Sequence, residues 1–126
     1  MTTINIGDLL TRPKFFGFVK LEHKGVVVAP NTVLHNTPEK GEHLATLHEF
    51  SSGEPVKVHR TGANPSSVIA RSQKVLANPK KYDAVSRNCE HTAYEIICGI
   101  AKSPLVIMGV IIIATATLVF IVSRRR

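Results

Sequence analysis

The apolar segment near the C-terminus is the feature that most limits how this chain can fold. Residues 104–122 carry no charged side chain, while Lys102 precedes them and Arg124, Arg125 and Arg126 follow. As a helix, such a segment is long enough to cross most of a bilayer core. A helix that is apolar on every face needs lipid or a large protein interior around it, and 126 residues cannot supply that interior. We therefore expect a transmembrane anchor over residues 104–123 and a basic tail over residues 124–126.

The remaining residues, 1–103, are enough for one small domain. The net charge of +7 comes from scattered Lys and Arg side chains, with no basic stripe interleaved with aromatics. This pattern favours contact with anionic lipid head groups and argues against a nucleic-acid partner. Asp8 and Arg12 interrupt the first apolar residues, so no signal peptide is predicted. We expect a single-pass, tail-anchored protein on the cytosolic face of an intracellular membrane. Basic residues flank the anchor at both ends, so its orientation stays open, as does the choice among mitochondrion, peroxisome and ER.

The chain has two cysteines, Cys89 and Cys98. On one helix, a separation of nine residues places them on opposite faces, about 900° of rotation apart, so they cannot form a disulfide. A reducing compartment is the simplest expectation. Cys98 is predicted to be a packing residue.

The order of local patterns predicts an α+β domain with an antiparallel sheet, because strand-like segments come first and helical segments follow. The expected strands cover residues 7–11, 16–28, 32–36, 44–50 and 56–60. Asn64 and Pro65 form a typical helix start, and Asn78-Pro79 ends that helix. A second helix is expected to begin after Asn88 and to reach about Gly99.

The tetrapeptide Asn88-Cys89-Glu90-His91 places a thiol at the first turn of this second helix. Unpaired N–H groups and the positive end of the helix dipole stabilise a thiolate there, which makes the sulfur a candidate nucleophile.

His23 and His35 are candidates for the base that such a nucleophile needs. If Ala29-Pro30-Asn31 forms a three-residue loop, position 35 lies opposite position 25, on the same face as position 23. The two imidazoles are then diagonal neighbours. A helix carrying Cys89, packed over that face, would complete a nucleophile, a base and an orienting group for thiol catalysis.

Other interpretations of these histidines remain open. A histidine in a strand is often an ordinary half-buried or surface residue, and six histidines in this chain produce pairs by chance. A zinc site could be built from Cys89, His91, His43 and His48, although the spacing matches no common Cys/His pattern. His91 lies about 200° around the helix from Cys89 and is expected to be a structural or rim residue. We expect no metal and no cofactor.

Several of these motifs together resemble a known family. They are Gly7-Asp8-Leu9, His23 followed by Val33-Leu34-His35, the Asn88-Cys89-Glu90-His91 tetrapeptide and the terminal apolar helix, in this order along nearly the whole chain. The chain resembles the lecithin:retinol acyltransferase-like (H-box/NC) proteins, above all the small membrane-anchored phospholipase A/acyltransferases. Some picornaviral H-box/NC proteins are also similar.

The resemblance implies a permuted papain-like (NlpC/P60-type) fold and specific roles for the site residues. Cys89 would be the nucleophile that carries the acyl group as a thioester, His23 the general base, and His35 the orienting or polarising third member. The backbone N–H of Cys89 would stabilise the oxyanion. The implied substrates are glycerophospholipids, cleaved with phospholipase A1/A2 activity, and the acyl group would pass to water, a lysophospholipid or the amine of phosphatidylethanolamine.

This chain departs from the family pattern at three positions, Leu21, Lys24 and Thr92, where relatives usually carry aromatic residues. Two other functions are therefore considered. One is a membrane adaptor, of the kind that a virus could encode, that keeps the fold, has little or no turnover and acts by binding a partner. The other is a thiol peptidase or deubiquitinase-like hydrolase.

Overall fold

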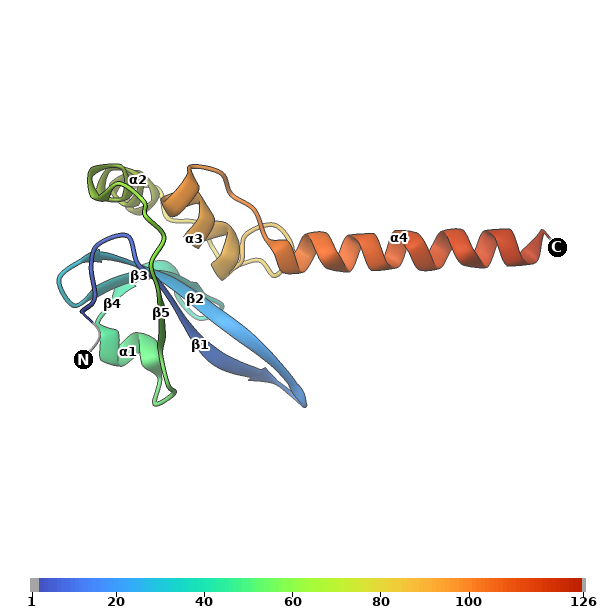
Figure 1. The fold of residues 1–126 in the computed structure, drawn as a ribbon, viewed down its shortest axis with the longest axis horizontal. Coiled ribbons are helices and arrows are strands. Elements are labelled where there is room, and N and C mark those ends of the chain that lie inside the picture. Colours follow the sequence, from blue (N-terminus) through green and yellow to red (C-terminus); the bar gives the residue numbers. More distant parts are fainter. Residues whose placement is uncertain (1–2, 126) are drawn as a thin grey trace.

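The computed structural model describes residues 3–125 and shows an α+β fold, in which an antiparallel sheet is followed by helices (Figure 1). Five strands form the sheet in the order β4-β3-β2-β1-β5. The strands are β1 (Leu9–Phe16), β2 (Val19–Ala29), β3 (Thr32–Thr37), β4 (Gly41–Ala45) and β5 (Lys57–His59). The helices are α1 (Leu47–Ser51), α2 (Pro65–Ala77), α3 (Cys89–Cys98) and α4 (Pro104–Arg124). The predicted fold class is confirmed.

The sheet has a hydrophobic core on each face, because consecutive side chains of a strand point to opposite sides. Val26 and Val28 pack with residues of α2 and α3, including Val68 and Ile96. The intervening Val27 packs on the other face, in a cluster that contains Phe50 of α1. An uninterrupted apolar run such as 26–28 is typical of a strand that is covered on both sides.

Strands β1 and β2 form one long hairpin, which differs from the predicted pair of a short strand and a separate long one. Pro13 lies inside β1, opposite Glu22 of β2. A proline lacks the N–H that a central strand needs, but β5 pairs only with the part of β1 from Leu9 to Thr11, so nothing on that side requires the missing donor. Gly17 supplies the positive φ, 59°, at the turn.

The segment predicted as a strand over residues 44–50 is mostly helical, and that prediction is wrong. Strand β4 ends at Ala45, and Thr46 caps α1. The Thr46 hydroxyl accepts a bond from the Glu49 N–H while the Glu49 carboxylate accepts one from the Thr46 N–H. This reciprocal capping box starts the helix and turns Phe50 into the core.

The register of β2 and β3 agrees with the prediction, since Gly25 lies opposite His35. The connection itself differs from the expected three-residue loop. The turn consists of Pro30 and Asn31, with Asn31 in the left-handed region at φ 49°, and the register shifts between Val27 and Ala29. The turn is one residue shorter than predicted, but the irregularity adds one unpaired residue to β2, so Gly25 still lies opposite His35.

The predicted helices α2 and α3 are both present. Asn64 and Asn88 cap them, and Gly99 ends α3 in a left-handed conformation. Both cysteines are free, as expected, but Cys98 is exposed at the last position of α3, so the prediction that it packs in the core is wrong. Ala93 and Ile96 provide the buried face of α3 instead.

Helix α4 projects from the domain as a single rod (Figure 1). It has 21 residues, none of which is buried against the rest of the chain. At 1.5 Å per residue its length is about 31 Å, close to the thickness of a bilayer core of about 30 Å. Its length and composition suit a membrane span.

Candidate active site

Asn88 organises the N-terminus of α3 and leaves the N–H of Cys89 uncommitted. The Asn88 side-chain oxygen accepts bonds from the N–H groups of Glu90 (2.9 Å) and His91 (3.2 Å). The His91 ring in turn accepts a bond from the Asn88 N–H at 3.1 Å, so His91 has the structural role that its helical position predicted. Within residues 3–125 the Cys89 N–H donates to no acceptor. It is therefore free to donate to a ligand beside the sulfur.

His23 and His35 lie in direct contact. His23 Nε2 and His35 Nδ1 are 2.8 Å apart, and both side chains are buried. Each ring centroid lies 5.4 Å from that of Phe50, and the His43 ring lies 4.3 Å from that of His35. The expected convergence of the two imidazoles is present, supported by the aromatic residue that α1 inserts beneath them.

Burial lowers the pKa of both imidazoles. For His23 the next causes are the neighbouring positive charge of a protonated His35 and the cations Arg12 and Lys14. For His35 the next causes are His43 and Arg12. Both rings are therefore neutral at neutral pH, the form in which an imidazole nitrogen can accept a proton.

Cys89 and His23 line one cavity of about 600 Å³. The cavity lies where β3 ends, since Thr37, Pro38 and Glu39 form another part of its wall. The packing differs from the predicted one, in which α3 covers the face that carries the imidazoles. Lys24, the neighbour of His23, points toward α3, so His23 faces the opposite side with Phe50. Cys89, at the N-terminus of α3, nevertheless lines the same cavity as His23.

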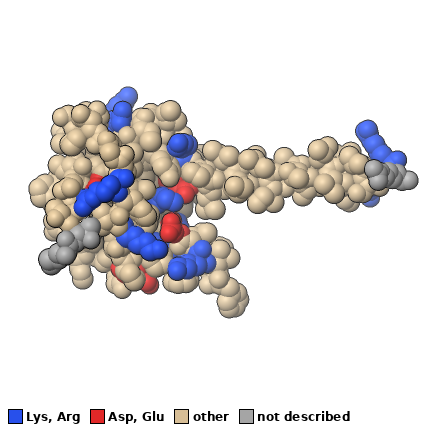
Figure 2. Space-filling view, in the orientation of Figure 1, with Lys and Arg blue, Asp and Glu red and all other residues tan. Residues whose placement is uncertain are grey.

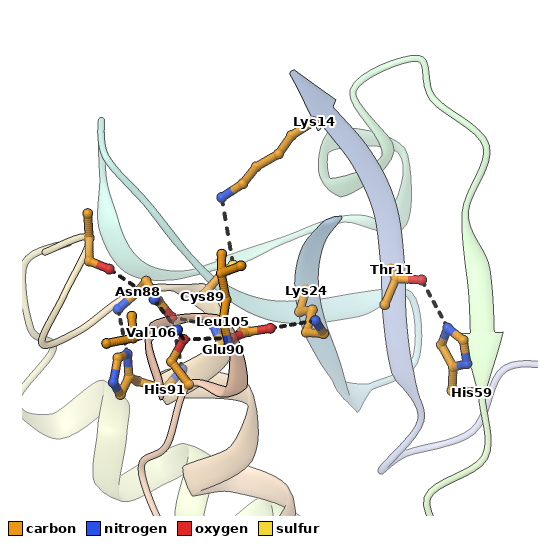
Figure 3. Close-up of polar contacts among 12 residues, drawn as sticks. Thr11, Lys14, Lys24, His59, Asn88, Cys89, Glu90, His91, Leu105 and Val106 are labelled. Atoms are coloured by element: carbon orange, nitrogen blue, oxygen red, sulfur yellow. Dashed lines mark hydrogen bonds and ion pairs between the residues drawn. The ribbon is translucent and has the colours of Figure 1, made fainter. Parts of the chain in front are cut away.

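Cations of β1 lie next to the sulfur. Lys14 Nζ is 4.0 Å from Cys89 Sγ (Figure 3). Arg12 lines the same cavity and donates from Nε to the Phe50 carbonyl at 2.6 Å. Positive charge at this distance stabilises a thiolate or another anion in the cavity. Sequence reasoning missed this group, because only the hairpin pairing brings β1 to the start of α3.

A polar network connects α3 to the first turn of α4 and was also missed. Glu90 accepts a bond from Lys24 Nζ at 2.8 Å and bonds from Ser103 Oγ (2.5 Å) and the Leu105 N–H (3.1 Å) (Figure 3). Ser103 caps α4 and also accepts a bond from Asn88 Nδ2 at 3.1 Å. The caps of the two helices are therefore bonded to each other, which fixes α4 relative to Cys89.

Charge pairing explains the lysine at one of the three unusual positions. Burial works against both charges, but the contact with Glu90 raises the pKa of Lys24, and contacts with Lys24 and Ser103 lower the pKa of Glu90. Both groups are therefore ionised at neutral pH.

The other two unusual positions have local roles. Thr92 is fully buried, and its hydroxyl lies 3.2 Å from Asn36 Nδ2, a donor on β3. Leu21 lines the cavity.

The zinc alternative has no support in the part of the chain from residue 3 to residue 125. No group of three or more His, Cys, Asp or Glu side chains is arranged there to hold a metal ion. His43 lies against His35 with its ring tilted, while His48 is exposed on α1 and lines a different cavity from the one that Cys89 lines.

Comparison with known proteins gives the family. The model of the family described as lecithin retinol acyltransferase matches residues 2–102. This chain belongs to the lecithin retinol acyltransferase family. Membership indicates an enzyme of the acyltransferase or phospholipase kind, with lipid substrates and an association with membranes. No curated protein matches the chain at a significant level.

Proposed function

We propose that this protein is a membrane-anchored thiol phospholipase A1/A2 and acyltransferase. Residues 1–103 would form the catalytic domain, and α4 would hold it on the cytosolic face of an intracellular membrane. It would take an acyl chain from a glycerophospholipid as a Cys89 thioester and pass it to water, a lysophospholipid or the amine of phosphatidylethanolamine. The proposal depends on one observation, that Cys89 and His23 line the same cavity. Among the described residues, the N–H of Cys89 is free there, and His23 is hydrogen-bonded to His35.

The hydrogen bond between the imidazoles assigns a role to each nitrogen. Because His23 Nε2 contacts His35, His23 Nδ1 is the nitrogen left to take the thiol proton. In that tautomer His23 Nε2–H donates to His35 Nδ1, and His35 carries its own proton on Nε2. His35 Nε2 is buried without a hydrogen-bond partner among the described residues, so this arrangement costs about 1–3 kcal/mol. His35 thereby orients His23 and is a positioning residue.

The reaction then proceeds in two transfers. The Cys89 thiolate attacks the ester carbonyl, and the oxyanion of the tetrahedral intermediate accepts the Cys89 N–H bond. The intermediate collapses to the thioester, and His23 returns the proton to the departing lysophospholipid oxygen. The acceptor, deprotonated by His23, attacks the thioester and releases Cys89. Lys14 stabilises the negative charge that forms on the sulfur as His23 takes the thiol proton.

Turnover of labelled phosphatidylcholine by the full chain in liposomes tests this proposal. We expect release of labelled fatty acid or its transfer to phosphatidylethanolamine, abolished in Cys89→Ala and retained in Cys98→Ala, a matched control because Cys98 is exposed and remote from the cavity lining. Full turnover by Cys89→Ala would refute the mechanism. No turnover of any phospholipid, together with cellular effects that Cys89→Ala leaves intact, would favour a membrane adaptor.

A further inference from the structure

The tip of the β1–β2 hairpin exposes an apolar cluster that no other part of the described chain covers. Phe15, Phe16, Phe18 and Val19 are all more than half exposed, and Phe18 is fully exposed at 107%. We call these four residues the hairpin tip. A soluble surface seldom gathers several large apolar side chains on one turn, and such a patch marks a contact surface.

The position of the tip relative to α4 points to its partner. Figure 1 shows the hairpin projecting on the side from which α4 leaves. Measured along the direction of α4, the turn of the hairpin reaches as far as the first part of that helix. Phe15, Phe16 and Leu105 of α4 line the same cavity as Cys89. The bonds from Ser103 to Asn88 and Glu90 keep the start of α4 in place beside that cavity. The tip and the anchor are thus held on two sides of one opening.

Charge agrees with a lipid surface. Lys14 and Lys20 flank the apolar tip on the two strands, and Figure 2 shows Lys and Arg side chains, with Asp or Glu among them, on the domain between the uncharged tip and α4. An apolar end with basic residues behind it suits the boundary between acyl chains and anionic head groups.

We propose that the hairpin tip inserts into the leaflet that surrounds the start of α4 and holds the mouth of the cavity against the bilayer. The inference rests on the proposed role of α4 as an anchor. With the tip and α4 both in the leaflet, a glycerophospholipid enters the cavity by lateral movement, without transfer of its chains through water. The partner is therefore the lipid bilayer, and the hairpin is a second membrane contact.

A fluorescence experiment can test this, because the chain contains no Trp. Three single-Trp variants of the full chain are placed in nanodiscs that hold one copy each: Phe18→Trp at the tip, Leu44→Trp on the distant strand β4, and Phe120→Trp inside α4. We expect blue-shifted emission for Phe18→Trp and a loss of that emission when the lipids are brominated near the head groups. Leu44→Trp, which replaces an exposed apolar residue of β4, is expected to show neither effect.

The outcomes separate the inference from the proposals beneath it. Emission of Phe18→Trp that matches Leu44→Trp would overturn the inference. Blue-shifted emission without quenching by lipid bromine would also overturn it, since a protein surface would then cover the tip. Quenching of Phe120→Trp by deeply brominated chains checks separately that α4 is inserted.

An activity measurement gives the second test. Phe18 and Val19 do not line the cavity, so a Phe18→Ser/Val19→Ser double variant leaves the catalytic groups in place. We expect its turnover of bilayer phosphatidylcholine to fall about tenfold, equivalent to about 1.4 kcal/mol of lost insertion, with turnover of a short-chain monomeric phosphatidylcholine unchanged. Equal rates on bilayers for the double variant and the parent would contradict the inference. Absence of turnover on either substrate by the parent would refute the proposed function and leave the fluorescence result to stand alone.

Discussion

The buried ion pair between Lys24 and Glu90 provides a sharp test of how the site is held together. Lys24 Nζ lies 2.8 Å from Glu90 Oε1, and the two side chains are 14% and 10% exposed. Removing one member of a buried pair leaves an uncompensated charge and costs about 3–5 kcal/mol. Lys24→Met falls at the low end, about 3 kcal/mol, because Glu90 keeps the donors of Ser103 and Leu105.

Glu90→Gln is expected to cost at least as much, since it leaves the Lys24 ammonium next to a neutral amide. The double variant Lys24→Met/Glu90→Gln removes both charges, so its loss is smaller than the sum of the two single losses by about 1–3 kcal/mol. A domain of this size has about 5–15 kcal/mol of stability, which makes each single loss large enough to measure.

Urea titration of the full chain in detergent micelles, followed by pulse proteolysis, measures these free energies of unfolding. Lys20→Met is the matched control, because Lys20 is exposed on the same hairpin and its replacement should change stability by no more than about 0.5 kcal/mol. A Lys24→Met variant as stable as Lys20→Met, or additive losses in the double variant, would refute the role assigned to the pair.

Three further predictions concern the groups around the cavity. His23 and His35 have lowered pKa values in the folded protein, so the unfolded chain binds more protons once the pH falls below the ordinary histidine pKa of about 6.5. The free energy of unfolding should therefore fall by about 3 kcal/mol between pH 7.5 and 5.5. A urea midpoint that stays constant over this range, or a pH dependence that persists after both histidines are replaced, would contradict this prediction. Gly25→Ala places a Cβ 2.7 Å from the Phe50 ring, so it should cost about 1–3 kcal/mol in the same titration and reduce turnover; wild-type behaviour would show that the ring does not support the imidazoles. Ser103→Ala removes the cap of α4 and its bonds to α3, and should cost about 1 kcal/mol and slow phosphatidylcholine turnover; an unchanged rate would show that the anchor need not be fixed to the nucleophile helix.

Local rules were enough to predict the elements whose signals lie close together in the sequence. Asn88 and Gly99 bound α3 as expected, because a cap and a left-handed glycine act within one turn. The register that brings His23 and His35 together was predicted from side-chain alternation and an assumed three-residue loop; the structure has this register, with a shorter turn and an irregularity in β2 in place of that loop. The helix at residues 47–51 had a readable capping box in Thr46 and Glu49, so that error came from giving the apolar pattern too much weight.

The remaining features depend on contacts between distant segments, for which one sequence has no local signal. Lys14 approaches Cys89 only because β1 folds back along β2. Lys24 departs from the family pattern in the sequence, and its ion pair with Glu90 forms only when α3 packs against β2. Helix α3 covers the face opposite to the imidazoles because its Ala93 and Ile96 pack against Val26, Val28 and Leu34, which alternate along the strands with His23 and His35.

The mass of the intact chain after brief exposure to phosphatidylcholine tests the central claim most directly. The account predicts one added acyl group, released by hydroxylamine as a thioester, present in Cys98→Ala and absent in Cys89→Ala. It also predicts that His23→Ala forms the adduct far more slowly, by about 10²–10⁴-fold, because the thiol has lost its base. An adduct that persists in Cys89→Ala, or phospholipid cleavage without any acylated chain, would contradict the account.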